Sequence, residues 1–354
     1  MTEEYDVIVA GGGPGGTTAA ICCARAGLRV LLLEKMARGR HKPCGGVLPL
    51  VAPDIIEQVV EAPIPASVMS RPPQLGLTYV PPSGRDNGGR LRGYAVHNID
   101  RDKFDIWMVD LAIEAGVEVR FSTRLVSFDQ GSSLIVEAVS GEDRTSIQTK
   151  FLIGADGARS VVRKMLFPAV REPVMLVGQE TWHGEGDFYN DFYILFRGRI
   201  SPACSYVIPK DGRFIIGTGV IPRSQPTVSQ ALHLLRGWLE TEFSFVGTTV
   251  ERRECWGIPF GEAAFGRGNV LLVGDAAGLC NPLSGEGIRL AVESGESAAS
   301  AIEKHIEDEG AVDEHAGRLS DLSSMVAHLH EFVTAADDNA REEFVRTELT
   351  RRMS

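Results

Sequence analysis

Residues 5–16 read Tyr5-Asp6-Val7-Ile8-Val9-Ala10-Gly11-Gly12-Gly13-Pro14-Gly15-Gly16. The first half is a short β-branched run, which is typical of a buried parallel strand. The second half is a glycine-rich turn with the G-x-G-x-x-G spacing at Gly11, Gly13 and Gly16. A strand that passes directly into such a turn predicts the beginning of a dinucleotide-binding βαβ unit.

The next residues complete that unit. Small residues from Thr17 to Ala26 predict a helix closed by Gly27, and Arg29 to Leu33 predict a second strand. Glu34 stands at the end of this strand, where a carboxylate can bind a ribose hydroxyl and would repel a 2′-phosphate. The unit therefore favours FAD or NAD over NADP.

The glycines of the turn have separate physical roles. Gly11 permits the tight turn, Gly13 lets the backbone approach a pyrophosphate, and Gly16 lets helix and strand pack closely. The helix N-terminus offers unpaired N–H donors and the positive end of the helix dipole to the phosphates. From this first unit we expect seven cofactor-binding residues: Gly11, Gly13, Pro14, Gly15, Gly16, Glu34 and Lys35.

Two later segments have a related outline. Residues 151–160 read Phe-Leu-Ile-Gly-Ala-Asp-Gly-Ala-Arg-Ser and predict a strand and a turn that lead into a helix from Val161 to Leu166. Residues 268–278 read Gly-Asn-Val-Leu-Leu-Val-Gly-Asp-Ala-Ala-Gly and lead through a second glycine-rich turn into a helix from Ile288 to Ala301.

Together the three segments resemble the para-hydroxybenzoate hydroxylase-like superfamily of FAD-dependent enzymes. The resemblance implies that Asp275 holds a ribityl hydroxyl and that the turn with Gly285 and Gly287 brings a helix N-terminus toward the flavin. Arg101 matches an arginine that begins a helix beside the cofactor in that superfamily. The resemblance favours FAD over NAD and extends the expected cofactor-binding residues to Arg101, Asp156, Gly157, Gly274, Asp275, Gly285 and Gly287.

Residues 42–50 read Lys-Pro-Cys-Gly-Gly-Val-Leu-Pro-Leu and narrow the resemblance further. Within the superfamily, this stretch resembles the geranylgeranyl reductase family, whose members use reduced FAD to saturate double bonds of isoprenoid chains. Shared phrases also occur at Phe104-Asp105-x-Trp107 and at Ile216-Gly217-Thr218-Gly219, and the likeness runs from about residue 5 to about residue 301.

The resemblance places the Cys44 turn against the flavin. Gly45 and Gly46 would let backbone press against the isoalloxazine, where a Cβ would clash, so Cys44, Gly45 and Gly46 are expected cofactor-binding residues. Cys44 would then donate a proton or shape the pocket, and the alternative is a buried packing thiol. Tyr206 is the second candidate catalytic residue.

The expected substrate region departs from the family. The family often carries P-x-x-Y-x-W-x-F-P before the I-G-T-G phrase, whereas residues 201–209 read Ser-Pro-Ala-Cys-Ser-Tyr-Val-Ile-Pro. Counted between Pro202 and Pro209, this stretch is one residue shorter and lacks tryptophan, with Tyr206 in place of one aromatic residue. It also faintly resembles the W-x-W-x-I-P phrase of flavin halogenases, without either tryptophan.

Composition limits the possible partners. The net charge of −11 argues against nucleic acid, which selects basic surfaces. No apolar run reaches the ~18 residues of a membrane span, and the acidic N-terminal residues do not resemble a signal peptide, so we expect a cytoplasmic protein. The six cysteines form no C-x-x-C pair or metal-ligand cluster, and we expect no metal site.

The predicted fold class is α/β: a Rossmann-type FAD-binding domain, an antiparallel-sheet substrate domain and a C-terminal helical segment. We expect the FAD-binding domain to be discontinuous, with residues 1–50, 95–168 and 265–305. The substrate domain then comprises residues 51–94, read as turns with short strands, and 169–264. Residues 306–354 form the helical segment, with one amphipathic helix over 319–350 that caps the core, covers the substrate opening or touches a membrane surface.

The predicted function is FAD-dependent reduction of C=C bonds in an apolar, isoprenoid-type substrate. An external reductant, NAD(P)H or another electron carrier, would supply the electrons, because no second dinucleotide motif is evident. The first alternative is a flavin-dependent monooxygenase or halogenase-like enzyme on a small or carrier-bound substrate. The second is a non-enzymatic binder of prenyl groups on a related fold.

Overall fold

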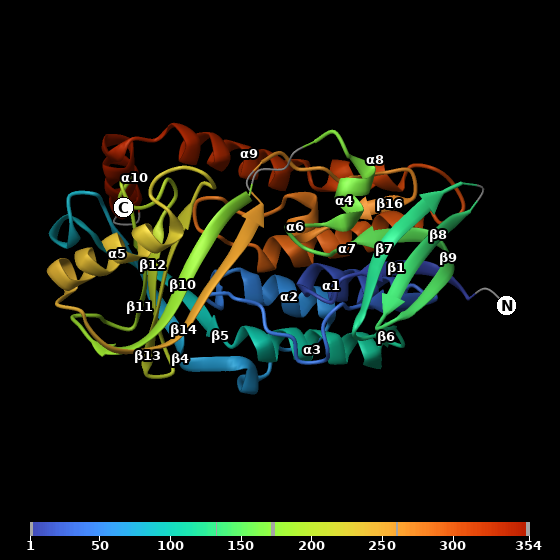
Figure 1. Ribbon diagram of the computed structural model, residues 1–354, viewed down its shortest axis with the longest axis horizontal. Helices are drawn as coiled ribbons and strands as arrows, with labels where there is room; N and C mark the ends of the chain where they lie inside the picture. The colour runs from blue at the N-terminus through green and yellow to red at the C-terminus, as the bar shows by residue number, and fades with distance from the viewer. Residues whose placement is uncertain (1–2, 132, 171–173, 260, 352–354) are drawn as a thin grey trace.

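The computed structural model describes residues 3–131, 133–170, 174–259 and 261–351. The chain folds into two lobes, each built on its own sheet, with helices packed between and along them (Figure 1). This arrangement confirms the predicted α/β class with two sheets and a C-terminal helical segment.

The first sheet has the N-terminal strand near its centre and the order β15-β16-β9-β1-β2-β6. Strands β16, β9, β1, β2 and β6 are parallel, as the buried apolar runs predict, and the antiparallel strands β8 and β7 extend from β9. Its strands are β1 (Glu4–Ala10), β2 (Val30–Leu33), β6 (Glu118–Arg120), β7 (Thr123–Gln130), β8 (Leu134–Ser140), β9 (Asp143–Gly154), β15 (Gly266–Arg267) and β16 (Val270–Leu272).

The second sheet has the order β14-β10-β13-β12-β11-β4-β5-β3. All of its neighbouring strands are antiparallel except β11 and β4, which run parallel. Its strands are β3 (Val47–Leu48), β4 (Met69–Val80), β5 (Gly89–Ile99), β10 (Val174–Glu185), β11 (Asp191–Leu195), β12 (Ser205–Lys210), β13 (Arg213–Val220) and β14 (Val246–Pro259). We propose that the two domains follow these sheets: β3 then lies within residues 1–50, which were expected in the other domain, and β5 crosses the expected boundary at 95.

Ten α-helices lie within the described ranges. They are α1 (Pro14–Arg25), α2 (Ala52–Val60), α3 (Arg101–Glu114), α4 (Val161–Leu166), α5 (Val228–Phe243), α6 (Gly274–Ala277), α7 (Ile288–Lys304), α8 (Ala311–Arg318), α9 (Ser320–Ala335) and α10 (Asp338–Arg351). Among them, none is long and apolar enough to cross a membrane.

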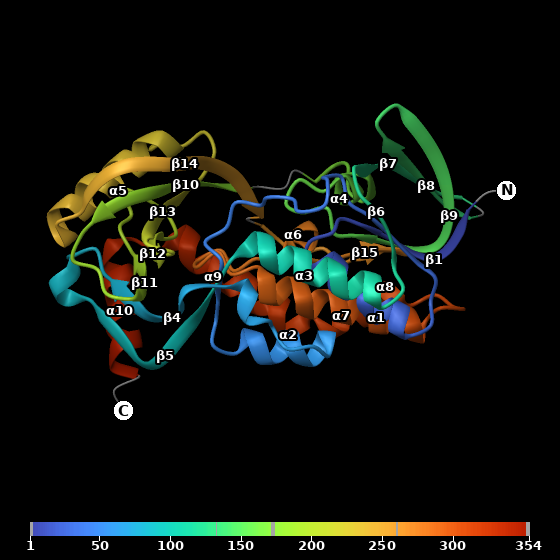
Figure 2. The same cartoon turned by 90° about the horizontal axis from the view of Figure 1, so that it is seen from below.

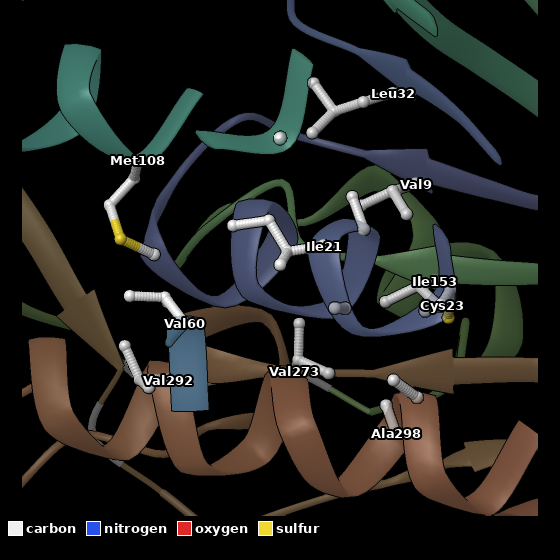
Figure 3. Close-up of a cluster of buried hydrophobic side chains, with 14 of the residues drawn as sticks. Val9, Ile21, Cys23, Leu32, Val60, Met108, Ile153, Val273, Val292 and Ala298 are labelled. Atoms are coloured by element: carbon white, nitrogen blue, oxygen red, sulfur yellow. The ribbon is translucent and has the colours of Figure 1, made fainter. Parts of the chain in front are cut away.

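Helix α1 packs between the first sheet and helix α7, and this layer forms the main core. Figure 3 shows Val9 and Ile153 from the sheet on one side of Ile21, with Val292 from α7 on the other. A Cβ added at Gly295 would lie 2.4 Å from the Gly15 carbonyl oxygen, so α1 and α7 approach too closely for a larger residue there. The close packing fixes the N-termini of both helices on one side of the sheet.

Two expectations about local structure were wrong. Residues 51–94 contain helix α2 and the two long strands β4 and β5, not short strands. Pro72 and Pro73, which suggested turns, lie where the β4–β5 register is interrupted between Met69 and Gln74, so their missing N–H groups break no regular pairing.

The expected single helix over 319–350 is also wrong, because it divides into α9 and α10. Ala336 has an extended ψ of 123°, and the Asp337 carboxylate accepts a hydrogen bond from Ala340 N at 2.8 Å, which begins a new helix. The C-terminal helices run from beside β16 to beside the second sheet (Figure 2). There, Val333 and Val345 are buried against the sheet in the capping arrangement.

Candidate functional site

The glycine turn between β1 and α1 admits no side chain at two positions. Gly11 has φ +117°, and a Cβ on it would lie 2.3 Å from the Ala155 carbonyl oxygen. A Cβ on Gly16 would lie 1.9 Å from the Gly11 oxygen. Strand β1, helix α1 and the turn after β9 therefore meet at van der Waals contact, as expected for Gly16.

Glu34 faces this turn. It is 3% exposed, and its carboxylate accepts hydrogen bonds from Gly12 N and Met36 N, each at 2.8 Å. A small cavity lies beside it, lined in part by Gly12, Arg38, Arg40 and Asp105. Lys35 is exposed.

Arg40 also reaches the turn, and the sequence analysis missed it. A Cβ on Gly13 would lie 3.2 Å from Arg40 Nη2, and Arg40 Nη2 donates to Asp105 Oδ2 at 2.5 Å. Arg40 Nε is buried with no hydrogen-bond partner among the described residues. An unpaired guanidinium donor beside a helix N-terminus fits an anionic ligand, but the basic run 38–42 alone did not show which residue would turn inward.

Asp275 of the third motif contacts the segment before the Cys44 turn. Lys42 Nζ lies 3.0 Å from Asp275 Oδ2, and a Cβ on Gly287 would lie 3.4 Å from Asp275 Oδ1. Gly287 is the N-cap of α7, and Gly274 has a left-handed φ of +56°. Gly285 has φ +73° in the loop between them. The expected residues Gly274, Asp275 and Gly287 thus gather around one helix N-terminus.

Asp156 has a local role. Its carboxylate accepts hydrogen bonds from Ser160 Oγ at 2.5 Å and Val161 N at 2.6 Å, which caps helix α4. Gly157 follows it with φ +86°. Both carboxylate oxygens are used within this turn, so its contact with a cofactor stays a proposal.

Arg101 is buried at the start of α3 and pairs with Asp105 at 2.7 Å. Burial lowers the pKa of Arg101, but the Asp105 charge and the Cys44 sulfur outweigh this effect and raise it overall. Burial alone would raise the pKa of Asp105. The positive charges of Arg101 and Arg40 outweigh burial and hold that pKa below its ordinary value. The charged side chain of Arg101 therefore lies beside Cys44, although the two residues are far apart in the sequence.

Comparison with known proteins agrees with this geometry. Residues 4–181 match the FAD binding domain family. The geranylgeranyl diphosphate reductase of Rhodobacter capsulatus is 33% identical over 317 residues, which cover 84% of this chain and 75% of that protein. The chain belongs to the geranylgeranyl reductase family of FAD-dependent oxidoreductases.

Solved structures share the fold of this family member. A geranylgeranyl bacteriochlorophyll reductase-like protein from Thermoplasma acidophilum superimposes with a TM-score of 0.82 at 20% identity, covering 98% of this chain and 92% of that one. The flavin-dependent halogenase CmlS superimposes with a TM-score of 0.74 at 19% identity, covering 99% and 68%. The fold is thus common to reductase-like and halogenase proteins.

The residues present fit FAD, the cofactor of this family. Helices α1 and α7 both have glycine N-caps, Gly13 and Gly287, so no side chain occupies their first-turn N–H donors. The unpaired Arg40 Nε lies beside the first of them, and Asp275 beside the second. We propose that Glu34 and Arg40 hold the ADP half and that Asp275 and the α7 N-terminus hold the flavin half.

Tyr206 belongs to a row of residues across four strands of the second sheet. Glu254, Gln179, Gly217 and Tyr206 lie opposite one another on β14, β10, β13 and β12. Because Gly217 has no side chain, the Tyr206 ring extends over it, where a Cβ would lie 2.1 Å from Tyr206 Cζ. The Tyr206 hydroxyl donates to Gln179 Oε1 at 2.9 Å. The I-G-T-G phrase therefore makes room for a tyrosine.

The row continues to the segment before the Cys44 turn. Gln179 Nε2 donates to Glu254 Oε2 at 3.3 Å, and Glu254 Oε1 lies 2.6 Å from His41 Nε2. His41 Nδ1 lies 2.7 Å from Asp102 of α3, so His41 bridges the two lobes. Sequence reasoning missed Gln179 and Glu254 because only the strand register shows that they lie beside Tyr206.

Burial affects the proton on Tyr206. Burial raises the pKa of Tyr206 well above its ordinary value, and Cys44, Cys204 and Glu254 raise it further. The hydroxyl therefore keeps its proton near neutral pH. Helix α5 packs on the opposite face of the sheet against Val207 and Ile216, so Tyr206 lies on the face toward the first lobe.

The glycines of the Cys44 turn pack against the second sheet. A Cβ on Gly45 would lie 2.5 Å from Ile208 Cδ1, and a Cβ on Gly46, at φ +64°, would lie 2.2 Å from the Ile99 oxygen. The second sheet thus gives both glycines a packing reason, and their contact with flavin stays a proposal. Cys44 Sγ accepts a hydrogen bond from Gly46 N at 3.3 Å.

Proposed function

We propose that this FAD-dependent oxidoreductase reduces C=C bonds of an apolar isoprenoid-type substrate. The observation that carries the proposal is that the Cys44 turn meets strand β12, which also carries Tyr206: a Cβ on Gly45 would lie 2.5 Å from Ile208 Cδ1, and Lys210 Nζ donates to Gly45 O at 2.7 Å. In agreement with this placement, Cys44 is among the groups that raise the Tyr206 pKa. The similarity to a protein named geranylgeranyl diphosphate reductase supports the substrate class.

The surroundings of Tyr206 suit an apolar chain. Buried Leu75, Val96, Ile208 and Ile215 form one apolar cluster, and half-buried Val47, Tyr94, Phe192 and Tyr206 pack against it. A hydrocarbon chain that lies against this face would gain about 25 cal/mol for each Å² of its own apolar surface that leaves water, which favours an apolar substrate over a polar one. A site of this kind would also exclude water from the reacting double bond.

Each reduced double bond takes up two electrons and two protons, which together add two hydrogen atoms. Reduced FAD, when bound, supplies the electron pair and one hydrogen. The second hydrogen arrives as a proton, for which the chain offers the Cys44 thiol and the Tyr206 hydroxyl. Gln179 accepts the Tyr206 hydrogen bond and so holds the phenol oxygen in place on this face of the sheet. An external reductant such as NAD(P)H then restores the cofactor.

Anaerobic single turnover tests the proposal. The FAD-loaded protein is reduced with dithionite, mixed with geranylgeranyl-bearing alcohols and diphosphates, and the products are weighed by mass spectrometry. We expect a gain of two hydrogens per reduced double bond, and a strong loss of this product in Cys44→Ala or Tyr206→Phe.

Other outcomes separate the alternatives. Oxygenated product formed only in air would favour a monooxygenase, and halide incorporation would favour a halogenase. A purified protein that retains prenyl groups without any flavin absorbance would favour a binder. Each of these results would replace the reductase proposal.

A further inference from the structure

Lys210 ends strand β12 on the face that carries Tyr206. Because side chains alternate along a strand, Tyr206, Ile208 and Lys210 point the same way. The Cys44–Gly46 turn meets this face: Ile208 fills the space beside Gly45, and Lys210 Nζ lies where a Cβ on Gly46 would approach to 2.5 Å. One strand of the second sheet therefore shapes the turn that carries Cys44.

The Lys210 ammonium group binds three backbone carbonyls. Nζ donates to Gly45 O at 2.7 Å, to Gly46 O at 3.2 Å and to Ile99 O at 2.6 Å. An ammonium group has three donors, so every one of its N–H bonds is used. Gly46 O also accepts from Ile99 N at 2.8 Å, which joins the turn to the end of β5.

This arrangement connects three parts of the site. The turn carries Cys44, β12 carries Tyr206, and β5 ends at Ile99, two residues before Arg101 of α3. The Lys210 side chain hydrogen-bonds both the turn, at Gly45 O, and the end of β5, at Ile99 O. Charge-assisted hydrogen bonds are roughly twice as strong as neutral ones, so the contact constrains the backbone firmly.

We propose that Lys210 is a positioning residue, which fixes the Cys44–Gly46 turn on β12 and so sets the placement of Cys44 relative to Tyr206. We call the three hydrogen bonds of Lys210 to Gly45 O, Gly46 O and Ile99 O the clamp. The chemical role of Cys44 and Tyr206 rests on the proposed function, whereas the clamp does not depend on it. No catalytic step passes through Lys210, because its donors point at carbonyl oxygens.

The electrostatic surroundings of Lys210 fit a buried ammonium group that keeps its charge at neutral pH. Burial lowers the pKa of Lys210 to about 8, while Cys44, Asp211 and Asp100 raise it and Arg213 lowers it further. The carbonyl oxygens favour the charged form, which alone has three donors to offer them. A neutral lysine has only two N–H donors and could not bind all three carbonyls at once.

Hydrogen exchange and thiol labelling of the FAD-loaded protein test the clamp without any substrate. In Lys210→Met we expect the peptide spanning residues 42–48 to exchange at least about tenfold faster, because charged hydrogen bonds to its carbonyls are lost. The pH profile of Cys44 alkylation by iodoacetamide, read by peptide mass, should shift as well. Cys255 is exposed and distant in the sequence from the turn, and its labelling should not change.

Two further variants make the test independent of folding. Lys210→Gly should show the same defects, and added n-butylammonium, which matches the four carbons and the ammonium group of the missing side chain, should restore slow exchange and the Cys44 profile. Lys304→Met, at an exposed lysine paired with Glu314, is the matched control and should resemble the wild type.

The result that overturns the proposal is a Lys210→Met protein with a lower melting temperature but unchanged exchange and Cys44 labelling, or the absence of butylammonium rescue. A clamp confirmed in a protein that reduces no isoprenoid would refute the proposed function and leave the positioning role standing. A protein that reduces isoprenoids normally but shows no effect of Lys210 on exchange or Cys44 labelling would refute the positioning role and leave the proposed function standing.

Discussion

Lys42 Nζ lies 3.0 Å from Asp275 Oδ2, although 233 residues separate them. The pair joins the segment before the Cys44 turn to the third sequence motif at the start of α6. Asp275 is 14% exposed and Lys42 32% exposed, so the pair is only partly screened by solvent. It places a positive and a negative group together beside the N-terminus of α7.

Asp275→Asn tests whether this position holds FAD. The amide keeps the shape of the carboxylate but removes its charge and leaves Lys42 without an anionic partner. We expect the FAD dissociation constant to rise about tenfold, the effect of losing one charge-assisted hydrogen bond of about 1.5 kcal/mol. Fluorescence titration of the apoprotein measures it. Asp321→Asn, on the exposed side of α9, is the control, and equal affinity in all three proteins would contradict the assignment.

Local pattern was enough to predict the first βαβ unit of the first lobe. The β-branched run, the glycine turn and Glu34 follow one another in the sequence, and the structure brings them together as expected. Asp275 and Gly287 were expected together from the family resemblance, and a Cβ on Gly287 would lie 3.4 Å from Asp275 Oδ1. Arg40 was missed because its neighbours in the sequence do not show that it reaches the turn at Gly13.

The antiparallel sheet of the second lobe was predicted, but its side-chain contacts could not be predicted in this way. Gln179 contacts Tyr206, Glu254 contacts Gln179 and Lys210 contacts the Cys44 turn only through the register of β10, β12, β13 and β14. A register is set by side-chain packing over the whole sheet, and one residue of slip would reverse every face. The C-terminal segment was predicted as one helix from the spacing of its apolar residues. It divides because the Asp337 carboxylate caps a new helix at Ala340 N.

Gly217→Ala is expected to destabilise the protein by displacing Tyr206. The added Cβ would lie 2.1 Å from Tyr206 Cζ, and overpacking of this kind costs about 1–3 kcal/mol. Urea unfolding measures the free energy. Gly237→Ala is the matched control, because nothing lies within 4 Å of its Cβ position in α5. In the Tyr206→Leu background the Gly217→Ala cost should fall sharply, and an unchanged cost would contradict the contact.

His315 is expected to make stability depend on pH in the acid range. It is fully buried, with Nδ1 2.9 Å from Ser297 Oγ and Nε2 3.0 Å from Leu272 O, and burial lowers its pKa to about 4. Because the unfolded histidine titrates near pH 6.5, the unfolded state binds a proton that the folded state rejects between pH 6.5 and 4. Stability from this group is therefore full above pH 6.5 and is lost as pH falls toward 4.

The size of this effect is up to about 3 kcal/mol, from a shift of roughly two and a half pKa units. Urea unfolding at pH 7 and pH 5 measures it, and His315→Gln should show a smaller difference between the two. His328→Gln, at an exposed position on α9, should keep the wild-type difference. If His315→Gln also kept it, another buried group would have to account for the acid dependence.

Gln179 is expected to act on the reaction only through Tyr206. Gln179→Leu removes the acceptor of the Tyr206 hydroxyl and leaves the phenol oxygen without its fixed position. We expect single-turnover alkene reduction to slow about 10–100-fold while FAD remains bound, because a misplaced proton donor loses only part of the roughly 10²–10⁴-fold that a well-placed one contributes. Tyr206→Phe should slow it at least as much, and the double variant should be no slower than Tyr206→Phe alone, because the effects of residues that act as a unit are not additive.

Stopped-flow reoxidation of the reduced protein by substrate measures all three variants. Additive losses would show that Gln179 contacts the substrate independently, and Gln230→Leu, in the capping box of α5 on the opposite face, controls for a general loss of stability.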